Sequence, residues 1–188
     1  MEDLIQRLLA FARQGEPAAD PTAVSLGAVA RDAWETVETG SLSLVVDDVE
    51  VTADPDRLRQ LLENLFRNSV EHGSTGSRAR PDDSVEHGST GNRPEADDSV
   101  EHADAATEIR VGPLDVGFYV ADDGPGIPEA DREAVLDSGY SGGDGTGFGL
   151  AIVETIAEAH GWEIGVVDSE DGGARFEFRA GDASGPPE

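Results

Sequence analysis

Two asparagines four residues apart, Asn64 and Asn68, stand in a stretch whose apolar pattern predicts a helix from about Pro55 to Val70. Residues at this spacing share one face of a helix, so the two amides lie one turn apart. An amide oxygen on a rigid helix can be one ligand of Mg²⁺, which prefers oxygen ligands and keeps several waters and phosphate oxygens. Exposed asparagines are common on helices, so this pair alone does not establish a site.

A second group of residues, Asp122-Asp123-Gly124-Pro125-Gly126, follows directly after an apolar strand. A buried carboxylate can accept a hydrogen bond from the amino group of adenine, and it repels the oxygen that guanine presents at the same position. Neighbouring glycines let a base approach the backbone closely. Asp-Gly is also an ordinary turn dipeptide, so this group is weak evidence by itself.

The third group is a glycine-rich run from Gly145 to Leu150, which opens a predicted helix from about Gly149 to Ala159. Backbone N–H groups and the dipole at a helix N-terminus can hold phosphates without a basic side chain. A Walker-type loop is excluded because it requires a lysine, and all 13 basic residues of this chain are arginines. In this order, the three groups together are hard to explain as ordinary turns, and they predict a site for Mg²⁺ and an adenine nucleotide.

The same groups resemble the N, G1 and G2 boxes of the ATP-binding domain of histidine kinases, within the wider group that includes gyrase, a heat-shock chaperone and MutL. Residues 63–69 resemble the N box, residues 122–128 the G1 box and residues 145–153 the G2 box. Residues 172–176 resemble the glycine-rich turn before the family's last strand. The resemblance implies a two-layer α/β (α+β) sandwich, with a mixed β-sheet on one side and about three helices on the other.

The resemblance also implies roles for individual residues. Asn68 would ligate Mg²⁺, Asn64 would line the phosphate end of the site, and Asp122 would accept from the adenine amino group. Glycines of the second group would shape the base pocket, and those of the third would close over the phosphates. The residues implied to bind ATP are Asn64, Asn68, His72, Asp122, Gly124, Gly126, Ile127, Tyr140, Gly145, Thr146, Gly147, Phe148, Gly149 and Leu150.

The implied activity is that of the catalytic domain of a two-component sensor histidine kinase, which transfers the γ-phosphoryl group of ATP to a histidine. None of the four histidines here has the acidic, polar and apolar surroundings of the family's phosphoacceptor. We therefore expect the acceptor on a histidine-bearing dimerisation helix outside this chain, with a response regulator downstream. Residues 1–16 resemble the end of that helical hairpin, which leaves a homodimer through the missing helices open.

Two departures from the family pattern keep a second function open, a nucleotide-binding regulatory module without transfer activity. Glu71 stands where many members have a lysine or arginine, which removes one expected phosphate contact. In the lid segment before the third group, Tyr140 is the only substitute for the family's phenylalanine. A serine kinase of the anti-sigma-factor type and a gyrase-like or MutL-like ATPase share these boxes. The hairpin stub argues against the first, and Asn64 in place of an acidic base against the second.

The remaining pattern predicts one domain over residues 22–180, interrupted by an insertion at 73–106 and followed by a disordered tail at 181–188. The sequence Ser-Val-Glu-His occurs three times at a spacing of 15 residues around this insertion, which is polar and of low complexity. Three repeated histidines could also form a metal array, but a flexible tract lacks the oriented partners that a metal site needs. Beyond the two helices already described, the predicted elements are a helix at 25–36 and strands at 43–46, 50–52, 108–111, 116–121, 163–167 and 174–179.

Composition excludes several classes of protein. The net charge of −27 and the absence of lysine disfavour direct binding to nucleic acid or anionic lipid, since both are bound through basic patches. There is no cysteine for disulfides or thiolate metal sites, no apolar run that could span a membrane, and no signal pattern, so we expect a cytoplasmic location. An acidic chain without lysine is typical of proteins from a salt-saturated cytoplasm, which suggests a halophilic archaeon as the source.

Overall fold

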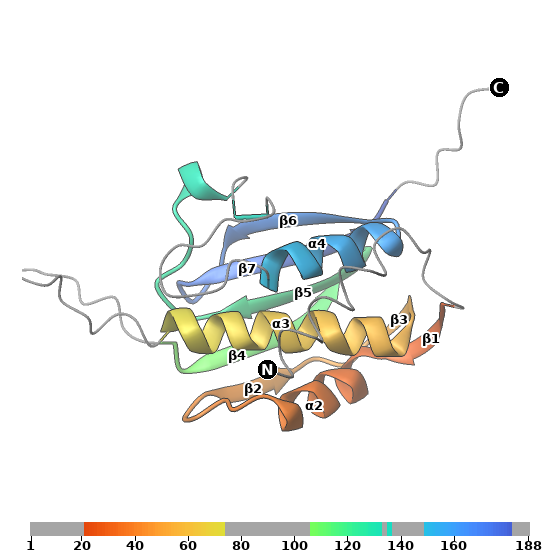
Figure 1. Ribbon diagram of the computed structural model, residues 1–188, viewed down its shortest axis with the longest axis horizontal. Helices are drawn as coiled ribbons and strands as arrows, with labels where there is room; N and C mark the ends of the chain where they lie inside the picture. Colours follow the sequence, from red (N-terminus) through yellow and green to blue (C-terminus); the bar gives the residue numbers. More distant parts are fainter. Residues whose placement is uncertain (1–20, 74–105, 133–134, 137–148, 182–188) are drawn as a thin grey trace, which may run out of the picture.

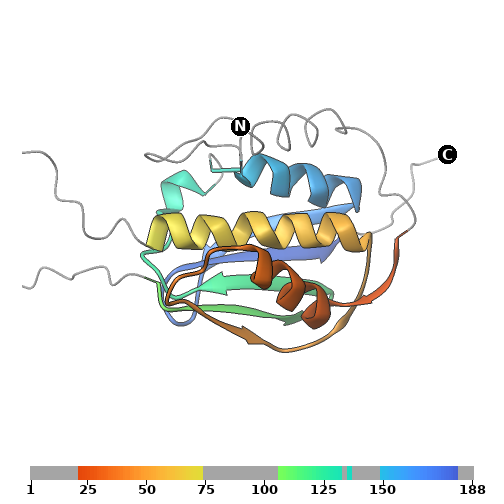
Figure 2. The same ribbon diagram turned by 60° about the horizontal axis from the view of Figure 1, so that its bottom comes forward.

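The computed structural model describes residues 21–73, 106–132, 135–136 and 149–181. Within these residues, three α-helices cover one face of a five-stranded β-sheet, and Figures 1 and 2 show the two layers from different sides. The elements are β1 (Thr22–Ser25), α2 (Leu26–Thr36), β2 (Ser43–Val46), β3 (Glu50–Ala53), α3 (Pro55–Gly73), β4 (Glu108–Leu114), β5 (Gly117–Asp122), the short 3₁₀ helix η2 (Glu129–Asp131), α4 (Gly149–Ala159), β6 (Trp162–Asp168) and β7 (Ala174–Ala180). The predicted two-layer sandwich is confirmed.

The strand order of the sheet is β2-β4-β5-β7-β6 (Figure 1). β2 runs parallel to β4, and the other neighbours are antiparallel, so the sheet is mixed as predicted. The connection from β2 to β4 includes α3, as a parallel pair requires a long crossover. This crossover brings α3 across the middle of the sheet, beside the end of β5.

The strands on either side of the Asp47-Asp48 turn do not pair with each other. Leu44 of β2 is in register with Ile109 of β4, whereas β3 pairs with β1 in a separate two-stranded sheet. The sequence pattern did not predict β1, because its four residues have no alternation of buried and exposed positions. Asp48 instead accepts from the backbone N–H of Gly27 at the start of α2. This bond, together with one from Ser25, lowers the pKa of Asp48.

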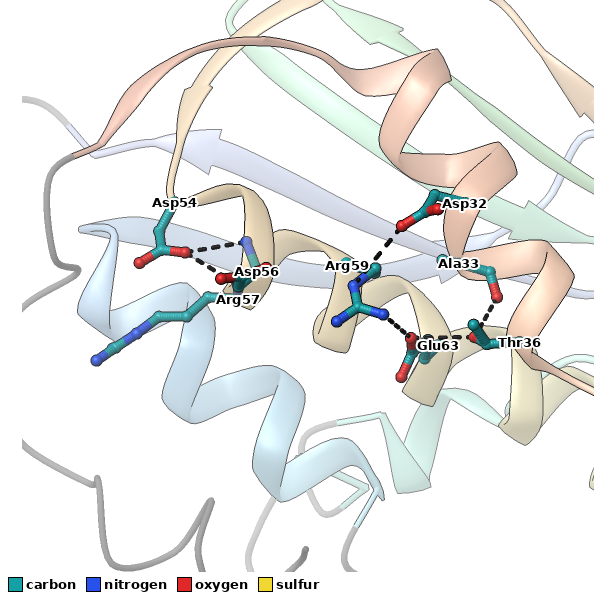
Figure 3. Close-up of polar contacts among 8 residues, drawn as sticks. All are labelled: Asp32, Ala33, Thr36, Asp54, Asp56, Arg57, Arg59 and Glu63. Atoms are coloured by element: carbon teal, nitrogen blue, oxygen red, sulfur yellow. Dashed lines mark hydrogen bonds and ion pairs between the residues drawn. The ribbon is translucent and has the colours of Figure 1, made fainter.

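Helix α3 begins as the sequence predicts. The carboxylate of Asp54 accepts from the backbone N–H groups of Asp56 and Arg57 at 3.0 and 3.1 Å (Figure 3), which is the geometry of an N-cap. The helix continues to Gly73, three residues beyond the predicted end at Val70. No helix-breaking residue stands before this glycine, so the first Ser-Val-Glu-His copy belongs to α3 and not to a loop.

The core lies between the helices and the sheet. The apolar face of α3 is fully buried there, and each large side chain on it contributes about 1.5–3 kcal/mol by leaving water. Trp34 of α2 packs edge-on against Phe66 of α3 with ring centroids 5.2 Å apart. The fully buried side chains of this core are Leu26, Leu58, Leu61, Leu62, Leu65, Phe66, Ile109, Val111, Phe118, Val153 and Phe178.

Polar contacts also join α2 to the solvent side of α3 (Figure 3). Arg59 lies 3.8 Å from Asp32 and 3.4 Å from Glu63, and the hydroxyl of Thr36 is 3.0 Å from the same glutamate. Exposed ion pairs of this kind contribute about 0–1 kcal/mol. Burial of the apolar face therefore holds the two helices together, and it fixes which face of α3 meets the end of β5.

Among the described residues, no helix combines the length and the apolar character that crossing a membrane requires.

Candidate nucleotide-binding site

Asp122, the last residue of β5, is the point where three distant parts of the chain meet. Its Oδ2 accepts from the hydroxyl of Ser69 on α3 at 2.9 Å. Its Oδ1 accepts from the backbone N–H groups of Gly124 and Ala174 at 3.0 and 3.1 Å. These three donors hold the carboxylate in one orientation, and they place the G1 group beside the N-box helix, as the sequence predicts.

Two glycines allow the backbone to close around this carboxylate. Gly173 has a φ of +62°, and a Cβ there would lie 2.1 Å from the carbonyl oxygen of Asp122. Gly126 has a φ of +74°, and its Cβ would be 3.2 Å from the carbonyl of Gly173. Both positions combine a left-handed backbone with close approach, which glycine alone tolerates at low cost. The G1 loop and the turn before β7 are therefore packed directly on one another.

Asn68, the residue before Ser69 on α3, lies against the beginning of α4. A Cβ on Gly149 would come within 2.8 Å of the Oδ1 atom of Asn68. The first turn of α4 contains no acidic residue. The amide oxygen of Asn68 and the positive end of a helix dipole therefore lie together, an arrangement that suits Mg²⁺ and phosphate oxygens respectively. The residues present thus fit a magnesium-bound polyphosphate.

Asn64 lies one turn earlier on α3 and is only 7% exposed. Its Nδ2 donates to the backbone carbonyl of Gln60 at 2.7 Å, so this amide is oriented by its own helix. Glu71, further along α3, is exposed. The described part of α3 therefore presents amides and no cation at these positions.

The remaining predicted site residues fall into two groups. Ile127 and Leu150 are partly buried and pack against the hydrophobic core, while Gly124 is half-buried and approaches Ala106. His72 belongs to the last turn of α3, but its side chain lies outside the described part of the structure. The other predicted ATP-binding residues that lie outside the described residues are Tyr140, Gly145, Thr146, Gly147 and Phe148.

Asp123, the residue after Asp122 along the chain, contacts the backbone at the start of β4 instead. Its Oδ1 accepts from the backbone N–H groups of Thr107 and Glu108 at 2.7 and 2.9 Å, and its Oδ2 accepts from the Thr107 hydroxyl. Burial acts to raise the pKa of Asp123, but these hydrogen bonds outweigh it and the pKa is lowered. Asp123 therefore fixes the chain where it enters β4.

Sequence reasoning did not assign Ser69, Gly173 and Ala174 to the site. Ser69 falls among the apolar residues of the predicted helix, and a hydroxyl on that face needs a partner inside the protein. The requirement for a hydrogen-bond partner was therefore the feature of the sequence that could have indicated a buried acceptor opposite this face of the helix. The glycine pair at 172–173 was recognised as a turn, but nothing in its sequence indicates which carboxylate it touches.

The face of the sheet away from the helices borders a cavity of about 310 Å³, whose lining extends to Asp122 and Asp123 at the end of β5. There the Arg175 guanidinium lies 3.9 Å from the centroid of the Tyr119 ring, and its Nε donates to Glu177. Arg110 donates to Glu108 at 2.8 Å. Since both arginines are already paired with carboxylates, this cavity does not resemble the phosphate end on the helix side.

The fold and the site together define a histidine-kinase-type ATP-binding domain. Residues 53–183 match the family model described as histidine kinase-, DNA gyrase B- and HSP90-like ATPase. This is well over half of the chain, and the chain therefore belongs to that family.

Known relatives of the chain include sensor kinases. It is 29% identical over 160 residues to the adaptive-response sensory kinase SasA of a Synechococcus strain, covering 80% of this chain and 36% of that protein. It is 33% identical over 128 residues to the sensor histidine kinase ZraS of Escherichia coli O157:H7, covering 68% of this chain and 22% of that protein. The chain thus spans little more than a third, or less, of the length of these relatives.

Solved structures show the same fold. The full-length ShkA complex with AMPPNP superposes with a TM-score of 0.62 at 26% identity, covering 95% of this chain and 35% of that one. The ATP-binding domain of PrrB from Mycobacterium tuberculosis superposes with a TM-score of 0.54 at 24% identity, covering 90% of this chain and all of that one. The chain therefore corresponds to the catalytic domain of a sensor histidine kinase.

Proposed function

We propose that this domain binds MgATP between α3, α4 and the G1 loop and transfers the γ-phosphoryl group to a histidine outside these 188 residues. One observation carries the proposal. Consecutive residues of α3 face two other parts of the proposed site, because Ser69 donates to Asp122 at the end of β5 and Asn68 lies against Gly149 at the start of α4. ShkA, which shares this fold, was solved with the ATP analogue AMPPNP, and this supports the assignment of the ligand.

At the base end, Asp122 would accept a hydrogen bond from the amino group of adenine. The carboxylate is well suited to this because backbone and side-chain donors already hold it in place. Gly124 and Gly126 leave room beside it, so the flat base can approach the G1 backbone. A guanine would present an oxygen to the same carboxylate and would be disfavoured.

At the phosphate end, the N-terminal N–H groups of α4 would hold the triphosphate, and the amide oxygen of Asn68 would hold its metal ion. Bound Mg²⁺ would neutralise part of the phosphate charge, and Asn68 is the residue that would ligate it. These neutral groups are important here, because a chain with a net charge of −27 repels a polyphosphate at long range. Phosphoryl transfer depends mainly on such positioning and electrostatic stabilisation.

The phosphate acceptor would be a histidine on the dimerisation helix of a sensor kinase, and a response regulator would receive the phosphoryl group next. The family relationship supports both partners, since SasA and ZraS are sensory kinases. We also propose a cytoplasmic location for the domain, where ATP is available. A homodimer through the helical hairpin would bring the acceptor to this site.

A regulatory module that binds ATP without transferring phosphate is the second candidate. Glu71 favours it, because this residue is exposed in the last turns of α3, near the phosphate end, and adds negative charge there. Such a charge repels the γ-phosphate at the moment when negative charge must be stabilised.

Transfer to a supplied acceptor distinguishes the two functions. The full chain would be incubated with γ-labelled ATP, Mg²⁺ and a purified histidine-bearing dimerisation hairpin from a related kinase. A kinase domain labels the hairpin with acid-labile phosphohistidine, and Asp122→Ala abolishes the label. ATP binding without any labelled histidine, over hairpins from several relatives, would instead support the regulatory module.

A further inference from the structure

The hydroxyl of Ser69 is placed to control which base the site accepts. We infer that Ser69 is a positioning residue that sets the specificity for adenine by orienting the Asp122 carboxylate. This inference rests on the proposed binding of ATP and extends it to a residue outside the assigned site. It stands on the 2.9 Å hydrogen bond between the Ser69 hydroxyl and the Oδ2 atom of Asp122.

The arrangement of donors leaves a defined acceptor position. An ionised carboxylate has about four acceptor positions, two on each oxygen. Backbone N–H groups of Gly124 and Ala174 occupy Oδ1, and Ser69 occupies one position on Oδ2. One position on Oδ2 therefore remains for a ligand, and it can only accept. An amino group satisfies it, whereas an oxygen on the base does not.

Loss of the serine hydroxyl would open a second position on the same oxygen. A water molecule can fill the space, because it would have the carboxylate as one polar partner and the base as another. Unlike the carboxylate, a water can also donate to the oxygen of guanine. The Ser69→Ala variant should therefore bind adenine less tightly and lose much of its preference against guanine.

Ser69 also belongs to the element that holds the phosphate end. It follows Asn68 directly on α3, and Asn68 lies against Gly149 at the start of α4. A purely structural effect of the substitution would shift α3 and weaken every nucleotide equally. An effect through Asp122 would depend on the group at position 6 of the purine, which provides the test.

The experiment measures dissociation constants by calorimetry for the full chain with three Mg²⁺-bound triphosphates: ATP, GTP and the purine riboside triphosphate, which has hydrogen in place of the amino group. Ser69→Ala should raise the dissociation constant for ATP by about tenfold, as expected for the loss of a hydrogen bond to a charged group. The dissociation constant for the purine riboside nucleotide should rise by less than about twofold, because that ligand makes no hydrogen bond to Asp122. Affinity for GTP should stay the same or increase.

Two variants serve as controls. Ser69→Thr keeps the hydroxyl and should restore ATP affinity to within about twofold of the original chain. Thr36→Ala removes a hydroxyl on α2 that contacts the backbone carbonyl of Ala33 and the carboxylate of Glu63 but not Asp122, and it should leave all three constants unchanged. Thermal unfolding of each variant checks that the fold is retained.

The outcomes separate this inference from the proposed function. If the unchanged chain binds ATP but Ser69→Ala weakens all three nucleotides by one common factor, or none of them, the positioning role is wrong and ATP binding stands. If the well-folded unchanged chain binds no nucleotide, both are wrong. The role of the hydroxyl would also be contradicted if Ser69→Thr has the melting temperature of the unchanged chain but does not recover its affinity for ATP.

Discussion

At the scale of single residues, Gly173 makes the sharpest prediction about stability. Gly173→Ala should lower the free energy of unfolding by about 2–4 kcal/mol, because alanine is strained in this left-handed backbone and its Cβ clashes with Asp122. The added Cβ would lie 2.1 Å from the carbonyl oxygen and 2.5 Å from the Oδ1 atom of Asp122. Urea unfolding of the two chains measures the difference. The clash should also displace the carboxylate and weaken ATP binding.

Gly40→Ala is the matched control for that substitution. Gly40 has nearly the same φ, +60°, but no atom lies within 4 Å of its added Cβ. Only the cost of the left-handed backbone applies there, about 1–2 kcal/mol. If the two variants lose the same free energy of unfolding, the clash with Asp122 does not contribute to the loss in Gly173→Ala.

The sequence predicted individual site residues only where a local motif marks them. Asp122 was predicted from the glycines beside it, and Asn68 from its spacing to Asn64. Ser69 was missed as a site residue because its partner lies 53 positions away in the chain. Helical periodicity tells which face a side chain occupies, but not which distant residue it meets.

At the scale of elements, Asp123 connects the end of β5 to the beginning of β4. Asp123→Asn should reduce the free energy of unfolding at pH 7 by about 1–2 kcal/mol, since a charged acceptor of several hydrogen bonds becomes neutral. The folded-state pKa of Asp123 is lowered from its ordinary value of 3.8. Its contribution is therefore present above about pH 4 and is lost as the pH falls through the folded-state pKa.

Chemical unfolding of the two chains at pH 7 and near pH 3 checks this sign. The difference in free energy of unfolding between the two chains should be largest at pH 7 and should become smaller in acid. Glu158→Gln, on the exposed side of α4, is a control for a general loss of negative charge. A difference in free energy of unfolding that increases in acid would show that the ionised carboxylate of Asp123 does not stabilise the fold.

Elements with a strong local signal were predicted well from the sequence. Asp54, followed by a proline and then a clear apolar stripe, fixed the start of α3 to the residue, because the N-cap is made within one turn. Strand β1 was missed, and the pairing of β2 and β3 with other partners was not foreseen. Short strands depend on tertiary pairing, which the local pattern does not contain.

At the scale of the whole molecule, the dominant feature is the large negative net charge. Forty acidic residues against 13 basic ones give the net charge of −27, and the repulsion among them opposes the compact state. Raising KCl from about 0.1 M to a few molar shortens the screening length from about 10 Å to about 3 Å or less. We expect a gain of about 3 kcal/mol in the free energy of unfolding, or roughly 10 °C in the melting temperature for a chain of this size.

Differential scanning calorimetry over this range of KCl measures the gain, with an uncharged osmolyte such as sorbitol as the control for general solvent effects. A rise in melting temperature that is equal in KCl and in sorbitol would contradict the role of charge screening. It would also remove the argument for a source with a salt-saturated cytoplasm.

The architecture as a whole was predictable because three motifs occur in a fixed order, and the family match over residues 53–183 agrees with it. The motifs predicted the mixed sheet and the helical layer only through the resemblance. The register that brings Ala174 of β7 to Asp122 of β5 depends on strands far apart in the sequence. No spacing rule within a single sequence provides such a register.

The central claim is that one pocket holds the base at Asp122 and the phosphates at Asn68. Calorimetric titration of the full chain with MgATP in multimolar KCl tests it most directly, beside Asp122→Ala, Asn68→Ala and the exposed control Asp115→Ala. We predict saturable binding to the unchanged chain and the control, and loss of binding in both site variants. Absence of binding to a well-folded chain, or full binding in both site variants, would contradict the claim.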